Sequence, residues 1–218
     1  MPRLGMALAL AAAVVVSAGC GGGQPTERTT TITVFRLQNG ALHAERAEVP
    51  AARSTPAAAL GALGLDVPVN VVEGTAHVDI DTLASGRVAE VVYTLTHLPT
   101  VRKVDVAGRR ALTRADVAAY LPPILVESPA DGQEVPSTFT VRGTAAVFEA
   151  TLVVELRRGG SLVERRTVTA TNGAPARGAF STVLRAPAGG PATVVAYAPS
   201  AADGSPQHIQ RVPVTVVG

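Results

Sequence analysis

Aromatic residues and cysteine are scarce in this sequence. Its 218 residues include no Trp, three Tyr, four Phe and one Cys. With so few flat rings to stack on sugars or bases, a carbohydrate cleft and a base-stacking surface are both disfavoured. A lone cysteine cannot form an intramolecular disulfide, so the fold must be stabilised by packing.

An excess of charge of one sign is also lacking. The chain has 19 Lys and Arg against 17 Asp and Glu, a formal net charge of +2. A basic stripe that holds nucleic acid is therefore not expected, and we predict no nucleic-acid partner. Charged residues make up 17% and hydrophobic residues 47% of the chain, which is typical of folded domains rather than of disordered chains.

The short motifs of common enzyme chemistry are absent as well. The sequence contains no HExxH, GxSxG or Walker-type loop. Asp203, Ser205 and His208 have the residue types of a catalytic triad, but DGSP is an ordinary turn sequence and a triad is defined by geometry. We therefore predict that the protein is not an enzyme and binds no cofactor.

The first residues predict export. Arg3 is followed by the apolar run 4–16 and by the small residues Ser17 to Gly19, which is the layout of a secretory signal. The run is shorter than the roughly 20 residues that a membrane-spanning helix needs. A cleaved leader, residues 1–19, is therefore expected rather than an anchor helix.

Cys20 follows this leader directly, and the segment resembles the lipobox of bacterial lipoproteins, with Ser17 where that family usually has an aliphatic residue. The resemblance implies acylation of Cys20 and a lipid anchor on the extracytoplasmic face of the cell membrane. Two or three acyl chains suffice for stable anchoring, at about 0.8 kcal/mol per buried methylene. Residues 20–30 would form a tether. The alternative is a secreted protein with a free thiol.

Residues 31–121 predict a small α+β domain. Polar and apolar residues alternate in the strands expected at 31–38, 41–49, 69–72, 75–81 and 101–106. Helical spacing predicts two helices with Thr55 and Ser85 as N-caps, and a capping-box variant at Thr113 predicts a short helix toward Tyr120. The expected arrangement is a small sheet with the helices on one face.

Two segments of this region, GTAHVDID and VAEVVYTLTHLPTVRKVDVAGRR, resemble the GerMN domain of bacterial sporulation and germination lipoproteins. The most specific part is VYTLTHLP, in which His97 stands where Gln is common. The resemblance covers residues 31–121. It implies an extracytoplasmic module with no established catalytic residues.

Residues 122–218 predict an all-β sandwich. Seven short strands separated by glycine-containing turns are expected at 124–128, 138–143, 150–158, 161–170, 179–186, 192–199 and 209–217. Without Trp, the core would rest on aliphatic residues and on Phe139, Phe148 and Phe180. The segments SPADGQEV, FTVRGTA and SAADGSPQHIQRVPVTV resemble the immunoglobulin-like domain that accompanies GerMN in germination-associated proteins.

Three residues are the best candidates for a metal site. His77, Asp79 and Asp81 are spaced two apart in a predicted strand, so they project from one face and two or three of them suit a divalent cation. The polar face of a one-sided sheet shows such residues without any metal. We predict no metal site and keep a metal-dependent envelope enzyme as an alternative.

Four arginines flank the turn at Gly159 and Gly160 and are candidates for contact with an anionic surface, such as a wall polymer or lipid head groups: Arg157, Arg158, Arg165 and Arg166. Glu155 and Glu164 lie close in sequence and are the expected partners if this is an ordinary solvated hairpin.

Taken together, the sequence predicts a lipid-anchored envelope protein whose two domains are non-catalytic interaction modules for other envelope proteins. The edge strands of a sandwich and of an open sheet offer natural docking surfaces for such partners. The family resemblance links the protein to sporulation and spore germination. A lipoprotein that binds cell-wall polymer is the alternative.

Overall fold

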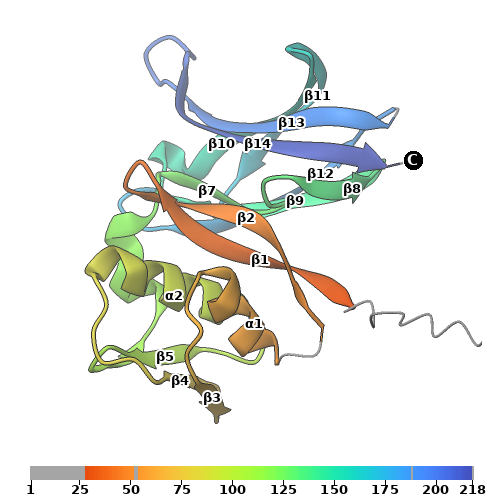
Figure 1. The fold of residues 1–218 in the computed structure, drawn as a ribbon. Helices are drawn as coiled ribbons and strands as arrows, with labels where there is room; N and C mark the ends of the chain where they lie inside the picture. Colours follow the sequence, from red (N-terminus) through yellow and green to blue (C-terminus); the bar gives the residue numbers. More distant parts are fainter. Residues whose placement is uncertain (1–27, 52–53, 188, 218) are drawn as a thin grey trace, which may run out of the picture.

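The computed structural model describes residues 28–51, 54–187 and 189–217. The predicted leader, Cys20 and most of the predicted tether lie outside this part of the chain. None of the helices in the described segments has the length and apolar character needed to cross a membrane. Strands dominate the fold, and within the described segments the α-helices lie in the first half (Figure 1).

The first half has three layers (Figure 1). One is the antiparallel hairpin of β1 (Thr29–Gln38) and β2 (Ala41–Pro50). The second contains the helices α1 (Thr55–Ala62) and α2 (Ser85–His97). The third is a sheet in the order β3-β4-β5-β6, with strands Val69–Val72, Thr75–Val78, Lys103–Val106 and Arg109–Leu112. Helix α2 crosses from β4 to β5, which are parallel.

The prediction of a small sheet with helices on one face is therefore confirmed only in part: the helices lie against the four-stranded sheet, but β1 and β2 form a separate sheet of their own. The hairpin forms its own sheet because side chains, not a neighbouring strand, accept hydrogen bonds from β1. The backbone N–H of Phe35 donates to Thr94 Oγ1 at 2.9 Å, and that of Leu37 donates to Glu90 Oε1 at 2.8 Å. Thr94 and Glu90, four residues apart on α2, are both buried, so the helix covers the edge that a further strand would use.

The predicted hairpin turns are confirmed, but the helix caps are not. Asn39 and Gly40 have φ of 51° and 82°, the left-handed pair of a tight two-residue turn. The helices begin at Thr55 and Ser85, and the preceding residues Ser54 and Ala84 are the N-caps, without a side-chain hydrogen bond. Thr113 does form the predicted capping box with Asp116, at the start of the 3-10 helix η1 (Arg114–Tyr120).

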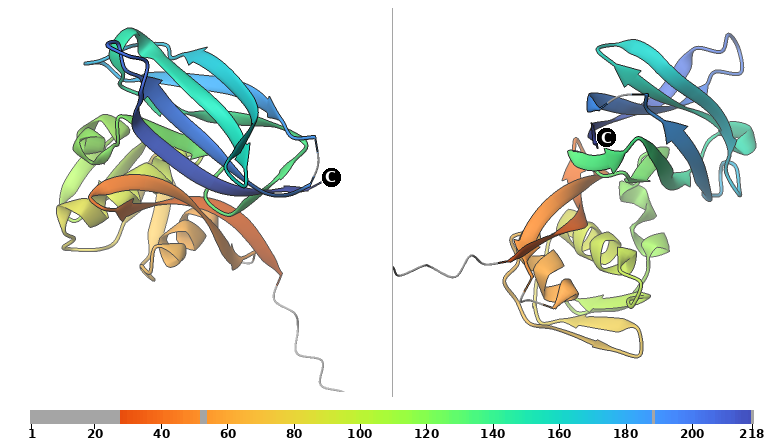
Figure 2. Two further views of the ribbon diagram at one scale, coloured as in Figure 1. Left: turned by 90° about the horizontal axis from the view of Figure 1, so that it is seen from above. Right: turned by 90° about the vertical axis from the view of Figure 1, so that its right-hand side faces the viewer.

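The second half is the predicted sandwich, with one strand more than expected. Its five-stranded sheet has the order β11-β10-β13-β14-β8 and its three-stranded sheet β12-β9-β7 (Figure 2). The strands are β7 (Ile124–Ser128), β8 (Gln133–Pro136), β9 (Thr138–Ala145), β10 (Thr151–Arg158), β11 (Ser161–Thr169), β12 (Gly178–Arg185), β13 (Gly190–Pro199) and β14 (Pro206–Val217). The unpredicted β8 pairs in parallel with β14.

Two of the three predicted core phenylalanines are buried. Phe139 and Phe180 lie in the sandwich core, but 71% of Phe148 is exposed. Phe148 lies in the short 3-10 turn η2 (Phe148–Ala150), where the next two residues have positive φ. The inward and outward alternation of a strand does not apply to such a turn, so the prediction for Phe148 is wrong.

Strand β7 supplies side chains to two cores. Ile124 and Val126 lie in the sandwich core, whereas Leu125 between them lies in the core of the first half and is fully buried. On its open edge, the backbone N–H of Val126 donates to the side-chain oxygen of buried Gln210 at 2.6 Å. Because neighbouring residues of a strand point to opposite faces, this short strand packs against both halves, and the backbone of Asp131 just after it adds hydrogen bonds to Ala44 and Arg46 of β2.

Truncation of Leu125 tests this shared packing. Leu125→Ala is expected to lower the free energy of unfolding by about 3 kcal/mol, because it leaves a cavity between the halves. The matched control Leu162→Ala, at a residue that is 46% exposed, is expected to cost less than about 1 kcal/mol. Urea unfolding followed by circular dichroism measures both, and equal losses would contradict this description.

A second prediction concerns the edge of β1. Thr94→Val keeps the shape of the side chain and removes the acceptor of the Phe35 N–H, so we expect a loss of about 2 kcal/mol. The exposed Thr140 on β9 is the control, and Thr140→Val is expected to change stability by less than about 0.5 kcal/mol. Similar losses for the two variants would show that the hydrogen bond from Phe35 contributes little.

Candidate functional site

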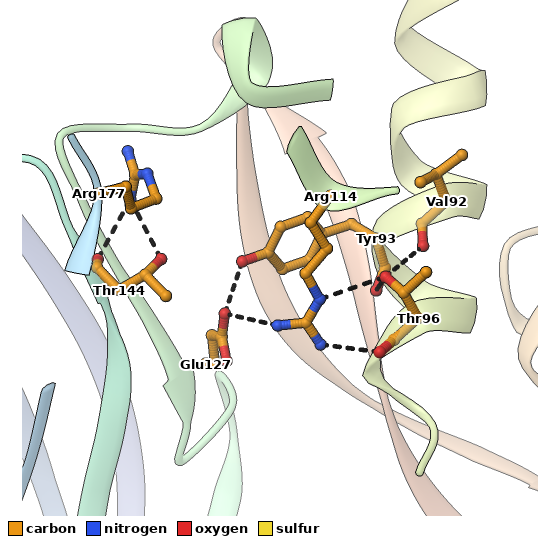
Figure 3. Close-up of polar contacts among 7 residues, drawn as sticks. All are labelled: Val92, Tyr93, Thr96, Arg114, Glu127, Thr144 and Arg177. Carbon is orange, nitrogen blue, oxygen red and sulfur yellow. Dashed lines mark hydrogen bonds and ion pairs between the residues drawn. The ribbon is translucent and has the colours of Figure 1, made fainter. Parts of the chain in front are cut away.

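The polar contacts between the two halves centre on Glu127 of β7 (Figure 3). The hydroxyl of Tyr93, from α2, donates to Glu127 Oε1 at 2.5 Å, and Arg114 Nη1, from η1, lies 3.3 Å from the same oxygen. Burial and the nearby Glu127 raise the pKa of Tyr93 far above its ordinary value. The phenol therefore stays protonated and remains a donor to the carboxylate.

Arg114 is held in place by further contacts with α2. Its Nη2 donates to the backbone oxygen of Thr96 at 2.9 Å and its Nε donates to Thr96 Oγ1 at 3.2 Å. The guanidinium carbon lies 4.7 Å from the centre of the Tyr93 ring, within the range of a cation–π contact. Arg114 thus binds the C-terminal end of α2, where backbone carbonyls lack intrahelical partners.

Arg177 makes a second set of contacts close to this junction. Its Nη1 donates to Thr144 Oγ1 at 3.1 Å, as Figure 3 shows. Its Nη2 donates to the backbone oxygen of Pro122 at 2.5 Å. These acceptors are neutral, and burial lowers the pKa of Arg177. Among the described residues, no carboxylate is in direct contact with its positive charge.

A cavity of about 650 Å³ lies at the junction. Its walls are His97 of α2, Arg114 of η1 and Glu127 of β7. Strands β9 and β12 contribute most of the remaining lining: Arg142, Gly143, Thr144, Ala179, Phe180 and Ser181. Because both halves contribute polar side chains to one hollow, this cavity is our candidate functional site, and such sites commonly lie between domains.

The cavity lining includes Gly143, a position where close packing leaves no room for a side chain. A Cβ at this position would lie 2.0 Å from the backbone oxygen of Leu125 and 2.8 Å from the ring of Phe180. No side chain fits there. The close approach of β7 and β9 at this point thus depends on glycine.

His97 is a titratable residue of the cavity wall. Its Nδ1 atom is buried and has no hydrogen-bond partner in the described part of the chain. Its ring packs edge-on against Phe35, with centroids 5.0 Å apart. Burial lowers the pKa of His97, the charge of Glu127 opposes this, and Arg114 and Arg142 add to it. The neutral imidazole is the form that the fold favours.

A family model matches the second half of the chain, whose strands β9 and β12 line the cavity. Residues 123–205 match the Gmad2 family. This family is described as the immunoglobulin-like domain of bacterial spore germination. The match confirms the predicted immunoglobulin-like domain, and the family that it belongs to is linked to spore germination.

Other comparisons add little. A comparison with curated proteins finds no significant match. Among solved structures, an engineered protein from the Northeast Structural Genomics Consortium is similar, with 17% identity, a TM-score of 0.33 and coverage of 62% of this chain and 36% of that chain. CopC from Methylosinus trichosporium OB3b has 23% identity and a TM-score of 0.27, with coverage of 41% and 86%. Neither TM-score is high enough to support an argument.

The candidate metal residues do not form a metal site with one another. His77 Nδ1 lies 3.1 Å from Asp105 Oδ2, and Asp79 and Asp81 line a shallow pocket beside it. Across the described residues, no group of three or more His, Cys, Asp and Glu side chains is placed to hold a metal ion. His77 is on the exposed face of β4, whereas Asp79 and Asp81 are exposed in the segment after the strand, which ends at Val78 and not at residue 81 as predicted.

The four arginines lie in the Gmad2 domain and have carboxylate neighbours. Glu155 is fully buried and accepts hydrogen bonds from Arg157 Nε at 2.6 Å, Arg165 Nε at 2.8 Å and the hydroxyl of Tyr197 at 3.0 Å. Burial opposes ionisation of Glu155, but these donors outweigh it and lower its pKa. Arg166 pairs with Glu164 at 2.5 Å.

The predicted partners Glu155 and Glu164 are thus in place, and Arg157 and Arg165 share the carboxylate of Glu155. Arg158 lines a separate pocket near Gly159 and Pro191. Contact of these four arginines with an anionic surface stays a prediction.

The cavity residues Arg142, Thr144 and Ser181 of the Gmad2 domain carried no recognisable signal in the sequence. They are ordinary outward positions of two strands, and their meeting with His97 depends on the docking of the first half. The single hint was His97 itself, which replaces the Gln common in the resembling motif.

The effect of His97 on stability is testable through pH. Because its pKa is lower in the folded than in the unfolded chain, the unfolded chain binds the proton first. Stability is therefore expected to fall as the pH drops below about 6.5, by at most about 1.4 kcal/mol per pH unit. His97→Gln removes this contribution, so the urea-unfolding free energy of the variant should depend less on pH between about 7 and 5. Parallel curves for the variant and the wild type would refute the assignment.

Proposed function

We propose that this protein is a lipid-anchored, non-catalytic interaction module on the extracytoplasmic face of the cell membrane, in a process linked to spore germination. The Gmad2 match supports the link to germination. The resemblance of residues 31–121 to GerMN domains agrees with it, since the two modules accompany each other in germination-associated proteins.

The observation that carries this proposal is the shared junction. A pair of modules joined by a free linker would present two separate surfaces. Here β7 packs into both cores, and the side chains of α2, η1 and β9 surround one cavity. A rigid composite surface of this kind suits recognition of a partner, because no interdomain freedom is lost when the partner binds.

The anchor is proposed at Cys20. Acylation there would hold the two modules at the membrane surface, with the residues between Cys20 and the start of β1 at Thr29 as a short tether. A tether confines the search for a partner to a thin layer above the membrane, which raises its effective concentration for membrane-bound partners.

Fatty-acid labelling tests the anchor. The wild type is expected to incorporate labelled palmitate and to sediment with membranes, and Cys20→Ala is expected to lose both properties. The control Ser17→Ala keeps the thiol and should behave as the wild type does. Label in Cys20→Ala, or a wild-type protein that is unlabelled and soluble, would rule out the lipid anchor.

In-cell photo-cross-linking tests the interaction role. With the cross-linker at position 181, at the cavity rim, we expect a discrete protein adduct that is reduced when Cys20→Ala releases the protein from the membrane. Recovery of wall glycan alone would instead support the cell-wall alternative and contradict this proposal.

A further inference from the structure

Arg142 is the charged group of the cavity that is left without a partner. It projects from the outer face of β9, the central strand of its sheet, and it is exposed. Within the described segments, no hydrogen bond or ion pair joins the side chain of Arg142 to another residue, although its backbone pairs with β7 and β12. Its guanidinium therefore presents its full set of donors to whatever enters the cavity.

The remaining charges of the cavity leave it electropositive. Arg114 and Glu127 neutralise each other at 3.3 Å. His97 is held in its neutral form by burial. Behind Thr144, Arg177 adds a second positive charge that contacts only neutral oxygens in the described structure. An anionic group is the ligand that this balance favours.

The cavity also contains a hydrogen-bond acceptor, the carboxylate of Glu127. An acceptor favours a ligand with N–H groups, such as a peptide, over a simple anion. Glu127 Oε1 accepts hydrogen bonds from the Tyr93 hydroxyl and from Arg114 Nη1, and no residue of the described chain donates to Glu127 Oε2. A carboxylate beside a bare phosphate or sulfate would repel it. A ligand that carries both an anion and N–H groups satisfies Arg142 and Glu127 together.

The lining suits such a ligand in size and polarity. A volume of about 650 Å³ is in the range of pockets that enclose small ligands or a few residues of a peptide. The lining includes the hydroxyl-bearing residues Thr169, Thr171 and Ser181 and the apolar Phe180. Hydroxyls and a guanidinium are the donors that recur in carboxylate recognition.

We propose that this cavity binds the C-terminal carboxylate of a protein partner's peptide chain, with Arg142 as the residue that binds the anion and Glu127 as the acceptor for a backbone N–H. The inference rests on the proposed function, because it states the chemistry of the partner. Its test needs no membrane, so failure of the anchor and failure of this site are separate results.

The probe is trialanine with a free C-terminal carboxylate, compared with trialanine amide. The protein is the full chain carrying Cys20→Ala, labelled with ¹⁵N, and binding is followed by the shifts of its amide signals. We expect the free acid to shift the signals of Thr144 and Ser181 and to bind at least about tenfold more tightly than the amide, since a charge-assisted bidentate contact is lost.

Two variants make the result specific to Arg142. Arg142→Ala should weaken binding of the free acid by about tenfold or more and leave the amide unaffected, whereas Arg185→Ala, on β12 outside the cavity lining, should change neither. Ser181→Trp retains Arg142 but fills the cavity, and it should abolish binding of both peptides.

Three outcomes overturn the proposal. The first is equal binding of the acid and the amide. The second is unchanged binding of the acid in Arg142→Ala. The third is binding of inorganic phosphate as tight as that of the free acid, which would assign the site to simple anions.

Discussion

Strand β7 packs its side chains into two cores, and the arrangement of the whole molecule depends on this. Ile124 and Val126 lie among the sandwich residues while Leu125 lies among those of the first half. Since a strand cannot shift by one residue without reversing every side chain, the register that builds the sandwich also fixes where the first half can dock. Glu127, two residues after Leu125 on the same face, then meets Tyr93 and Arg114.

The open edges of two sheets are also held by contacts with other layers. Side chains from other layers bind edge N–H groups at three points: Thr94 and Glu90 bind β1, and Gln210 binds β7. All three side chains are buried. Each would be costly to bury without its partner, so these bonds favour one arrangement of layers over others. They also remove edges on which other chains might pair, which directs recognition toward side-chain surfaces such as the cavity.

Much of the local structure could be predicted from the sequence. The Asn39-Gly40 turn needs left-handed backbone, and the apolar stripe of Val88, Val91, Val92 and Leu95 could only be a buried helix face; all four are buried. The strands of the sandwich followed from alternation. These features depend on residues close together in the chain. There, the spacing of apolar residues and the residue types of a turn determine the local structure.

What could not be predicted depends on contacts between distant residues. The separate hairpin sheet arises from a bond between Phe35 and Thr94, 59 residues apart, and the junction from one between Tyr93 and Glu127, 34 residues apart. Leu125 has the same appearance in sequence as its neighbours in ILVES, although it serves a different core. The cavity has no local signature, because it exists only once the two halves are docked.

The central claim is that the two halves form one cooperative unit through β7. Amide hydrogen exchange of the wild type at increasing urea concentration tests it most directly, since it reports the opening free energy of each element separately. The account predicts that the slowest amides of α2 and of β10 converge on a single free energy and the same urea dependence. A lower free energy for α2, reached while β10 stays protected, would show that the first half unfolds on its own and would contradict the account.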